Sequence, residues 1–208
     1  GKRISNKLSE AGIKSNFING LRVTDEKSIN IVEEVLSNFN KEITEALKAN
    51  NCDSHGITSK KNNILIVSKE NNNLGFVGTP KEIDKSIIED IVKDKKVPVI
   101  APLGLDANNQ VFNINADTAA GSIAKKLNAR RLIIISDVEG VLDNNKKLIS
   151  EIDTTKINEL IKNHTINGGM IPKIKNCLDV ASNGVKGVCI IDGRLEHSIL
   201  FELLSNAG

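Results

Sequence analysis

Apolar residues recur at every third or fourth position after Thr24, which is the spacing of one face of an α-helix. Thr24 or Asp25 supplies a side chain that suits the N-cap of such a helix. The apolar stripe consists of Ile29, Val32, Leu36, Phe39, Ile43 and Leu47. We therefore predict a long helix that begins here and buries this stripe.

The next stretch, residues 51–78, is polar and rich in Gly and Asn. It contains two short β-like runs, at 64–67 and 74–77, which predict hairpins near the surface. A polar turn at 106–109 is expected to be exposed.

From residue 84 onward, helical and strand patterns alternate. The predicted helices are 84–92, 117–127, 155–162, 172–181 and 196–204, and the predicted strands are 97–101, 132–135 and 187–191. The run 132–135 is apolar on both faces, as in parallel sheets that helices cover. The alternation predicts an α/β fold, a three-layer αβα sandwich with a mainly parallel open sheet and with its sites at the carboxyl ends of the strands.

No repeat or flexible linker marks a domain boundary, so we expect the boundary inside compact structure, between Leu127 and Leu132. This gives an N-terminal lobe of residues 1–128 and a C-terminal lobe of residues 129–208.

Composition narrows the classes of partner. Hydrophobic residues make up 39% and charged residues 26% of the chain, with a net charge of +2 and no basic block or aromatic platform, so nucleic acid and anionic membranes are not expected partners. The three cysteines are far apart, which fits a reducing, cytoplasmic compartment. No apolar run approaches the ~20 residues of a membrane span, and no signal peptide is recognisable.

Common nucleotide signatures are missing from the sequence: GxxxxGK[ST], GxGxxG after a strand, and the HRD and DFG motifs. Their absence argues against P-loop, Rossmann and protein-kinase chemistry.

Two segments of the first half place polar side chains beside regular elements. In 19–25, local chemistry favours a plain turn and N-cap, and the functional alternative makes Arg22 a bidentate clamp for a carboxylate. In 112–117, Asn113, Asn115 and Asp117 alternate and would project to one side of an extended stretch. The plain alternative is an Asx turn with a helix cap at Asp117.

Two further segments stand out in the second half. Residues 136–143 follow the apolar strand directly, where open α/β sheets bind ligands. In 167–173, two glycines and a proline precede Lys173, so backbone N–H groups and the lysine would face a phosphate, the alternative being a capped helix with a solvated lysine.

Taken in order, these segments resemble the motifs of the N-acetylglutamate kinase family of the amino-acid kinase superfamily. The resemblance is carried by residues 19–25, 74–78, 98–104, 113–120, 136–143, 168–173 and 191–194. Residues 1–5 resemble the end of that family's His-Gly-Gly-Gly phosphate loop. We therefore expect a first strand with a catalytic lysine upstream of Gly1, a closing strand beyond Gly208, and no activity from the fragment alone.

The resemblance implies transfer of the γ-phosphoryl group of ATP to the γ-carboxylate of N-acetyl-L-glutamate, the second step of arginine biosynthesis. Mg²⁺ would be bound mainly through the nucleotide phosphates. An acceptor carboxylate with a pKa near 4.3 is ionised at neutral pH, so the site needs to neutralise charge rather than supply a base.

The resemblance also assigns roles to individual residues. Lys173 and Asp117 would be catalytic, and Gly1, Arg22, Asn113 and Asn115 would bind the acyl-amino acid. The ATP site would be lined by Asp137, Val138, Glu139, Gly140, Val141, Leu142, Thr165, Ile166 and Asn167.

A candidate effector site for L-arginine comes from the last predicted helix, where His197, Glu202 and Gly208 resemble the arginine-sensitive branch of the family. Five residues separate His197 from Glu202, so on an ideal helix they lie ~140° apart. The alternative is that Ile199, Leu200 and the neighbouring leucines form a core face while His197 and Glu202 are solvated. A homodimer, or a hexamer built as a trimer of dimers, is expected.

Two other functions fit the same segments. One is a related acyl-phosphate-forming kinase that acts on an aminoadipate derivative, glutamate or aspartate. The other is a catalytically inactive amino-acid sensor of the same fold.

Overall fold

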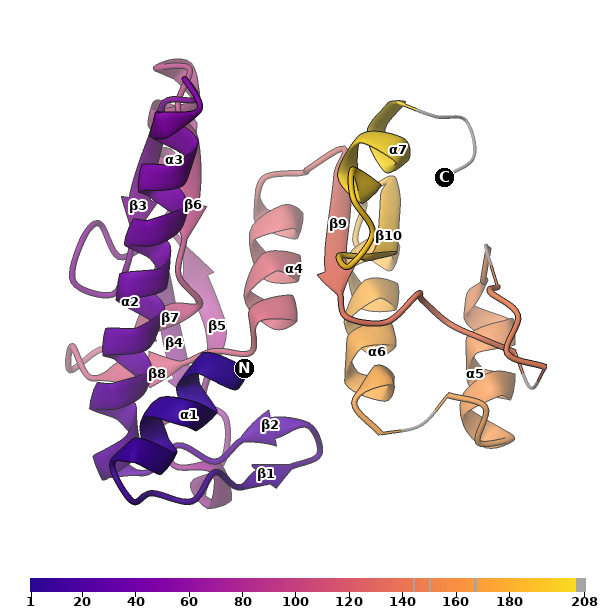
Figure 1. Ribbon diagram of the computed structural model, residues 1–208, viewed down its shortest axis with the longest axis horizontal. Helices are drawn as coiled ribbons and strands as arrows, with labels where there is room; N and C mark the ends of the chain where they lie inside the picture. Colours follow the sequence, from indigo (N-terminus) through magenta and orange to yellow (C-terminus); the bar gives the residue numbers. More distant parts are fainter. Residues whose placement is uncertain (144, 150, 167, 205–208) are drawn as a thin grey trace. The chain divides into compact units, whose positions relative to one another are not determined.

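The structure, a computed structural model, describes residues 1–143, 145–149, 151–166 and 168–204, and only the backbone of residue 154. The chain divides into two units, Gly1–Lys126 and Leu127–Gly208 (Figure 1). Each unit is described by itself. No helix in the described part of the chain is long and apolar enough to cross a membrane.

The first unit combines helices with short strands. Its helices are α1 (Lys2–Glu10), α2 (Glu26–Ala49), α3 (Lys85–Lys93) and α4 (Ala116–Lys126), with a 3₁₀ turn, η1 (Asn72–Leu74). Its strands are β1 (Phe17–Ile18), β2 (Leu21–Arg22), β3 (Ser54–Ile57), β4 (Leu65–Lys69), β5 (Gly78–Ile83), β6 (Val97–Ile100), β7 (Leu103–Leu105) and β8 (Val111–Asn113).

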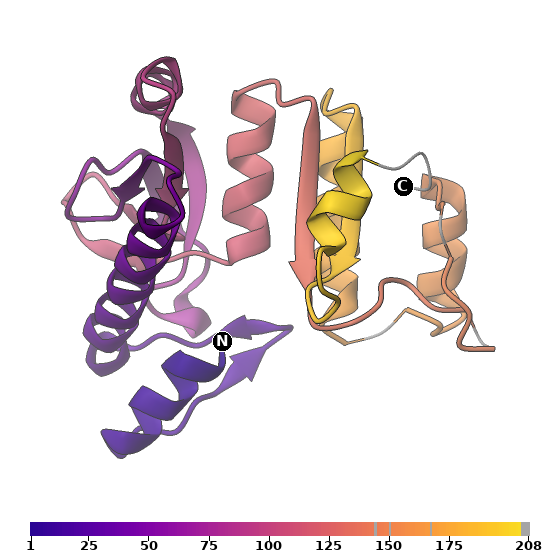
Figure 2. The same cartoon turned by 45° about the horizontal axis from the view of Figure 1, so that its top comes forward.

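Parallel and antiparallel pairs both occur in the first unit. β3 pairs with β6 in parallel, and a four-stranded sheet in the order β5-β4-β7-β8 contains a parallel β4–β7 pair between two antiparallel hairpins. β1 and β2 form a separate hairpin beside α1, as Figures 1 and 2 both show. The predicted α/β class with parallel strands is confirmed.

The long helix α2 begins where predicted, because the Asp25 carboxylate accepts a hydrogen bond from the Ser28 N–H at 2.8 Å. Its first half buries the predicted stripe, with Ile29 and Val32 almost fully buried. The second half does not, since Phe39 is exposed and Asn40 is buried instead. The Asn40 amide donates to the carbonyls of Ile57 at 3.2 Å and Val99 at 2.7 Å, so a polar contact fastens α2 to β3 and β6.

The run 74–77 is not a surface hairpin strand as predicted. Leu74 ends η1, and both Leu74 and Val77 are buried. The segment instead crosses the chain near Thr24, whose N–H donates to the Leu74 carbonyl at 2.9 Å. A local sequence pattern cannot show such a long-range crossing.

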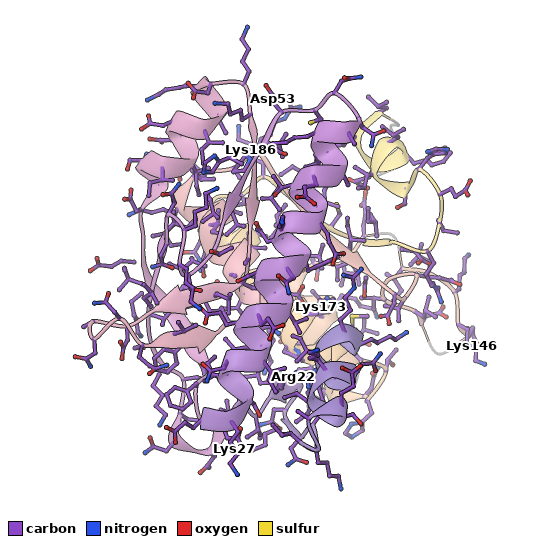
Figure 3. All side chains as sticks on the ribbon, turned by 60° about the vertical axis from the view of Figure 1, so that its left-hand side comes forward. Arg22, Lys27, Asp53, Lys146, Lys173 and Lys186 are labelled. Carbon is purple, nitrogen blue, oxygen red and sulfur yellow. The ribbon has the colours of Figure 1, made fainter. Side chains whose placement is uncertain are left out.

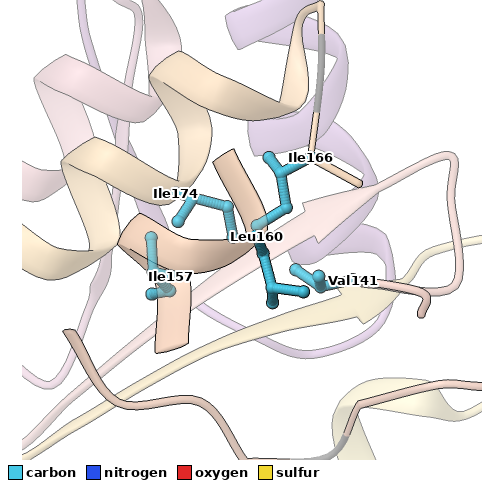
Figure 4. Packing of buried hydrophobic residues seen from close by; sticks show 5 residues of the cluster. All are labelled: Val141, Ile157, Leu160, Ile166 and Ile174. Atoms are coloured by element: carbon cyan, nitrogen blue, oxygen red, sulfur yellow. The ribbon is translucent and has the colours of Figure 1, made fainter. Parts of the chain in front are cut away.

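The second unit is built on one pair of parallel strands, β9 (Arg131–Ser136) and β10 (Gly187–Asp192). Its helices are α5 (Thr154–Lys162), α6 (Met170–Ser182) and α7 (Ser198–Leu204). Both α6 and α7 pack against β10. A hydrophobic cluster joins α5 and α6 to the loop after β9, and Figure 4 shows its members, Val141, Ile157, Leu160, Ile166 and Ile174.

Candidate active site

Arg22 ends β2 and is buried, with only 8% of the residue exposed. It donates to the hydroxyls of Ser15 at 2.8 Å and Ser5 at 3.0 Å, and to the Gly1 carbonyl at 3.1 Å. The ring of Phe17 covers one face of the guanidinium at 4.6 Å from the ring centroid. Figure 3 labels Arg22. Gly1 and Arg22, both predicted substrate residues, are therefore in contact.

Burial lowers the pKa of the Arg22 guanidinium from its ordinary value. An arginine remains protonated in proteins nonetheless, so the first unit holds a buried positive charge. Among the described residues, no carboxylate contacts this guanidinium. The site therefore has charge to offer to an anionic ligand.

Three segments, around Thr24, Gly75 and Asn113, cross at one place in the first unit, and this crossing connects Arg22 to Asn113. Thr24 is completely buried, and its hydroxyl donates to the Arg22 carbonyl at 3.1 Å while accepting from the Asn113 amide at 3.2 Å. Gly75 passes so close to Thr24 that an added Cβ would lie 2.3 Å from the Thr24 carbonyl oxygen, and its φ of +70° also favours glycine. The Asn113 N–H completes the crossing by donating to the Phe76 carbonyl at 2.9 Å.

The extended stretch predicted for 113–117 ends earlier. Asn113 closes β8, but α4 begins at Ala116, so Asp117 lies in the first turn of a helix rather than on an extended strand. The Asn115 side-chain oxygen accepts from the Thr118 N–H at 3.0 Å, as a capping residue does. The cap is thus Asn115 and not Asp117, because α4 begins at Ala116, one residue before the predicted start of the helix.

In the second unit, the predicted nucleotide loop leaves the carboxyl end of β9. Asp137, Val138 and Glu139 are exposed there, whereas Gly140 and Val141 are buried. Leu142 forms an isolated antiparallel bridge with Leu148. The Val141 side chain belongs to the hydrophobic cluster, so this residue can meet a ligand only through its backbone.

The second predicted nucleotide segment leads into α6. Ile166 is buried in the same hydrophobic cluster, Thr165 is half-buried, and Asn167 lies outside the described residues. Lys173 occupies the first turn of α6, which begins after Gly169 without a side-chain cap. Its side chain is half-buried, so the helix start and the lysine together offer donors suited to an anion.

The predicted effector residues differ from expectation. His197 has a left-handed φ of 62° and precedes α7, so the ideal-helix angle to Glu202 does not apply. Glu202 is half-buried in α7. Its backbone carbonyl accepts from Arg131 Nη1 at 2.8 Å, and its carboxylate lies 3.5 Å from the same nitrogen. Burial and, after it, Glu202 raise the pKa of the neighbouring Cys189 thiol to about 12. Gly208 lies outside the described residues.

The alternative view of α7 as a core-facing helix is wrong. Its apolar side chains are exposed, among them Ile199, Leu200, Phe201, Leu203 and Leu204. A cavity of about 430 Å³ is lined by His197, Leu200, Phe201 and Leu204. A second cavity of about 310 Å³, lined by His55, Asn62 and Lys96 among others, contains none of the predicted site residues. Across the described residues, no cluster of three or more His, Cys, Asp or Glu is arranged to hold a metal ion.

Several residues that hold the candidate substrate residues in place are not predicted from the sequence. Ser5, Ser15 and Phe17 surround Arg22, and Thr24 connects it to Asn113. Their sequence signal is weak, since a serine in a helix and a phenylalanine in a two-residue strand are unremarkable. Only Phe17 could have been suspected, as the one aromatic residue near a candidate carboxylate clamp.

Comparisons with known proteins show what the whole chain is similar to. The model of the amino acid kinase family matches residues 1–192. The chain is 68% identical to an acetylglutamate kinase of Pelagibacter ubique and 44% identical to one of Campylobacter fetus, matching all of this chain and 72% and 75% of those proteins. The solved structure of smu.665 from Streptococcus mutans aligns with 91% of this chain and 78% of its own, at 30% identity and a TM-score of 0.86.

Proposed function

The chain belongs to the amino acid kinase family and, within it, to the acetylglutamate kinases, and on this basis we propose how its two units divide the work. The reaction is the ATP-dependent phosphorylation of the side-chain carboxylate of N-acetyl-L-glutamate, a step of arginine biosynthesis. The first unit binds the acyl-amino acid, and the second binds the nucleotide.

The observation that carries the first assignment is the buried charge of Arg22. Serine hydroxyls, a carbonyl and an aromatic ring fix the guanidinium, but no described carboxylate neutralises it. A planar guanidinium matches the two oxygens of a carboxylate, so the α-carboxylate of N-acetyl-L-glutamate would compensate this charge. Asn113, connected to Arg22 through Thr24, would bind the same ligand.

The second assignment rests on the loops of the second unit. The exposed residues 137–139 extend from the carboxyl end of β9, where open α/β sheets bind ligands, and Lys173 lies at the start of α6. In this proposal Lys173 stabilises the transferring phosphoryl group, and Asp117 is a catalytic residue of the first unit. Mg²⁺ accompanies ATP and is held mainly by its phosphates.

The substrate assignment is tested by offering the complete gene product a panel of acceptors with MgATP and trapping acyl phosphate with hydroxylamine. N-acetyl-L-glutamate should give the highest kcat/KM, ahead of an N-acyl aminoadipate, glutamate and aspartate. A higher kcat/KM for one of the others would reassign the substrate. No hydroxamate from any acceptor would favour an inactive sensor.

Inhibition by L-arginine is a second proposal, in which the Glu202 carboxylate binds the guanidinium of the inhibitor. Its carboxylate already lies near the Arg131 guanidinium, so a free arginine would have to compete with an arginine of the chain itself. Inhibition of the wild type by millimolar L-arginine, together with its loss in Glu202→Ala, would support this role. An insensitive wild type, or equal inhibition of the variant, would contradict it. A dimer or a hexamer is proposed as the assembly, to be measured by light scattering with and without arginine.

A further inference from the structure

The segment that follows β10 lies against the end of β9. Asp192 pairs in register with Ser136, so both strands end at the same edge of the sheet. The Gly193 N–H then donates to the Ser136 carbonyl at 2.8 Å. An added Cβ at Gly193 would lie 2.5 Å from a methyl carbon of Ile135, so the close approach requires glycine. This places Arg194 beside the loop 137–142.

Asp192 fixes the position of the Arg194 side chain. Nε donates to both carboxylate oxygens of Asp192, at 2.9 and 3.1 Å, and Nη2 donates to one of them at 2.7 Å. The backbone N–H of Arg194 donates to the same carboxylate at 2.9 Å. Only 5% of the Asp192 side chain is exposed, against 58% for Arg194. One edge of the guanidinium is therefore held by a buried anion while the rest faces solvent.

The remaining nitrogen of Arg194 is available. Nη1 makes no hydrogen bond to any residue that the structure describes, so its two N–H groups can bind a ligand. A contact that served only to close the turn after β10 would need no more than the pair with Asp192. The Nη1 donors of the fixed Arg194 side chain are therefore available to a ligand where the proposed nucleotide loop leaves β9.

Arg194 also lies near the negative charges of the loop that follows β9, and it can offset them. Asp192, and after it the charges of Glu139 and Asp137, raise the pKa of Arg194. Two of them, Asp137 and Glu139, belong to the loop proposed to bind ATP. Without a nearby cation they would repel a polyphosphate, because like charges interact strongly over short distances at a protein surface.

We infer that Arg194 is a further nucleotide-binding residue, which donates from Nη1 to an anionic oxygen of the ATP polyphosphate and offsets the carboxylates of Asp137 and Glu139. Asp192 is its positioning residue. The inference rests on the proposed function, because it requires that ATP binds at loop 137–142.

The test compares dissociation constants of ATP and adenosine, measured by NMR titration with Mg²⁺ present. Arg194→Met should weaken ATP binding roughly tenfold or more, the usual effect of losing a hydrogen bond to a charged group, and leave adenosine binding unchanged. Its ATP affinity should also depend less on salt than that of the wild type. Arg194→Lys, which keeps the charge but loses the fork, should give an intermediate ATP affinity and serves if Arg194→Met does not fold.

Lys186→Met is the matched control. Lys186, labelled in Figure 3, is exposed just before β10, at the opposite end of the strand and roughly 20 Å away by strand geometry. The Lys186→Met substitution removes the same charge as Arg194→Met and should leave the ATP affinity unchanged. Equal losses for ATP and adenosine in Arg194→Met, or unchanged ATP affinity, would overturn the inference and leave the proposed function intact. A wild type that binds no ATP would overturn both.

Discussion

The side-chain amide of Asn113 donates a hydrogen bond to the hydroxyl of Thr24, 89 residues earlier in the chain, at 3.2 Å. Because the same hydroxyl donates to the Arg22 carbonyl, one buried threonine couples the two residues proposed to bind N-acetyl-L-glutamate. The separation between guanidinium and amide in the first unit is thus set by a side chain that need not touch the ligand.

Thr24→Val tests this coupling. Valine keeps the shape but leaves the Asn113 amide without its acceptor, so we expect a loss of about 1 kcal/mol in the free energy of unfolding. The KM for N-acetyl-L-glutamate should rise while the KM for ATP is unchanged. Urea denaturation and steady-state kinetics measure the two effects, and an unchanged acceptor KM would show that Thr24 serves stability alone.

Arg22→Lys should mainly raise the KM for the acyl-amino acid. Lysine keeps the charge but cannot bind a carboxylate with two parallel hydrogen bonds, and it lacks the planar fork that places one nitrogen on Ser15 and the other on Ser5. Initial rates with each substrate varied in turn provide the measurement. Impaired ATP binding with a normal KM for the acyl-amino acid would show that Arg22 does not belong to the acceptor subsite.

Lys173→Ala should lower kcat by roughly 10² to 10³, because a charge-stabilising donor contributes most in the transition state. The KM for N-acetyl-L-glutamate should change far less. Lys175→Ala, two residues on and exposed, is the matched control and should retain normal turnover. A Lys173→Ala variant with half the wild-type kcat would remove this lysine from the mechanism.

Local patterns predicted the elements of this fold well because caps and periodicity are local physics. The helix at 26–49 begins at its predicted cap, Asp25, and the apolar run at 132–135 lies within a parallel strand. The same reasoning failed for Phe39 and Asn40, since a buried amide that bonds two strand carbonyls is invisible to a hydrophobic pattern.

The candidate site shows the same limit. Arg22, Asn113 and Lys173 are predicted site residues because their motifs resemble a family, not because the sequence reveals their surroundings. Arg22 depends on a serine 17 residues earlier, and Glu202 approaches an arginine 71 residues earlier. Contacts across such separations are decided by the fold, and no local spacing predicts them.

Asn40→Ala should lower the free energy of unfolding by roughly 1–3 kcal/mol, because it deprives buried carbonyls of their donor. Asn50→Ala is the control: its amide donates to the Ala46 carbonyl at 2.9 Å on the same helix, but at an exposed position. This substitution should cost less than about 0.5 kcal/mol. Equal losses in chemical denaturation would mean that the polar contact between α2 and the strands does not contribute.

Cys189 should react slowly with alkylating reagents. With its pKa raised to about 12 by burial and by Glu202, the thiolate fraction at pH 8 is on the order of 10⁻⁴, and the thiolate is the reactive form. Because this pKa is higher in the folded chain than in the unfolded one, the protonated thiol contributes to the free energy of unfolding below about pH 9. This contribution is lost as the pH rises from 9 to about 12.

Mass spectrometry of iodoacetamide labelling at pH 8, folded against urea-denatured, measures that reactivity. Labelling of Cys189 should be fast only in the denatured chain, and Glu202→Gln should speed it in the folded one. Rapid modification of the folded wild type would contradict the raised pKa.

The crossing at Gly75 also has a consequence for the order of folding. Its isolated bridges join Thr24 to Gly75 and Val77 to Asn113, so three segments that are distant in sequence must meet at one place. Closing such long loops costs entropy before any contact repays it, and local helices form first. The acceptor site should therefore be among the last features to appear during refolding, and a chain with its helices already formed would not yet recognise its substrate.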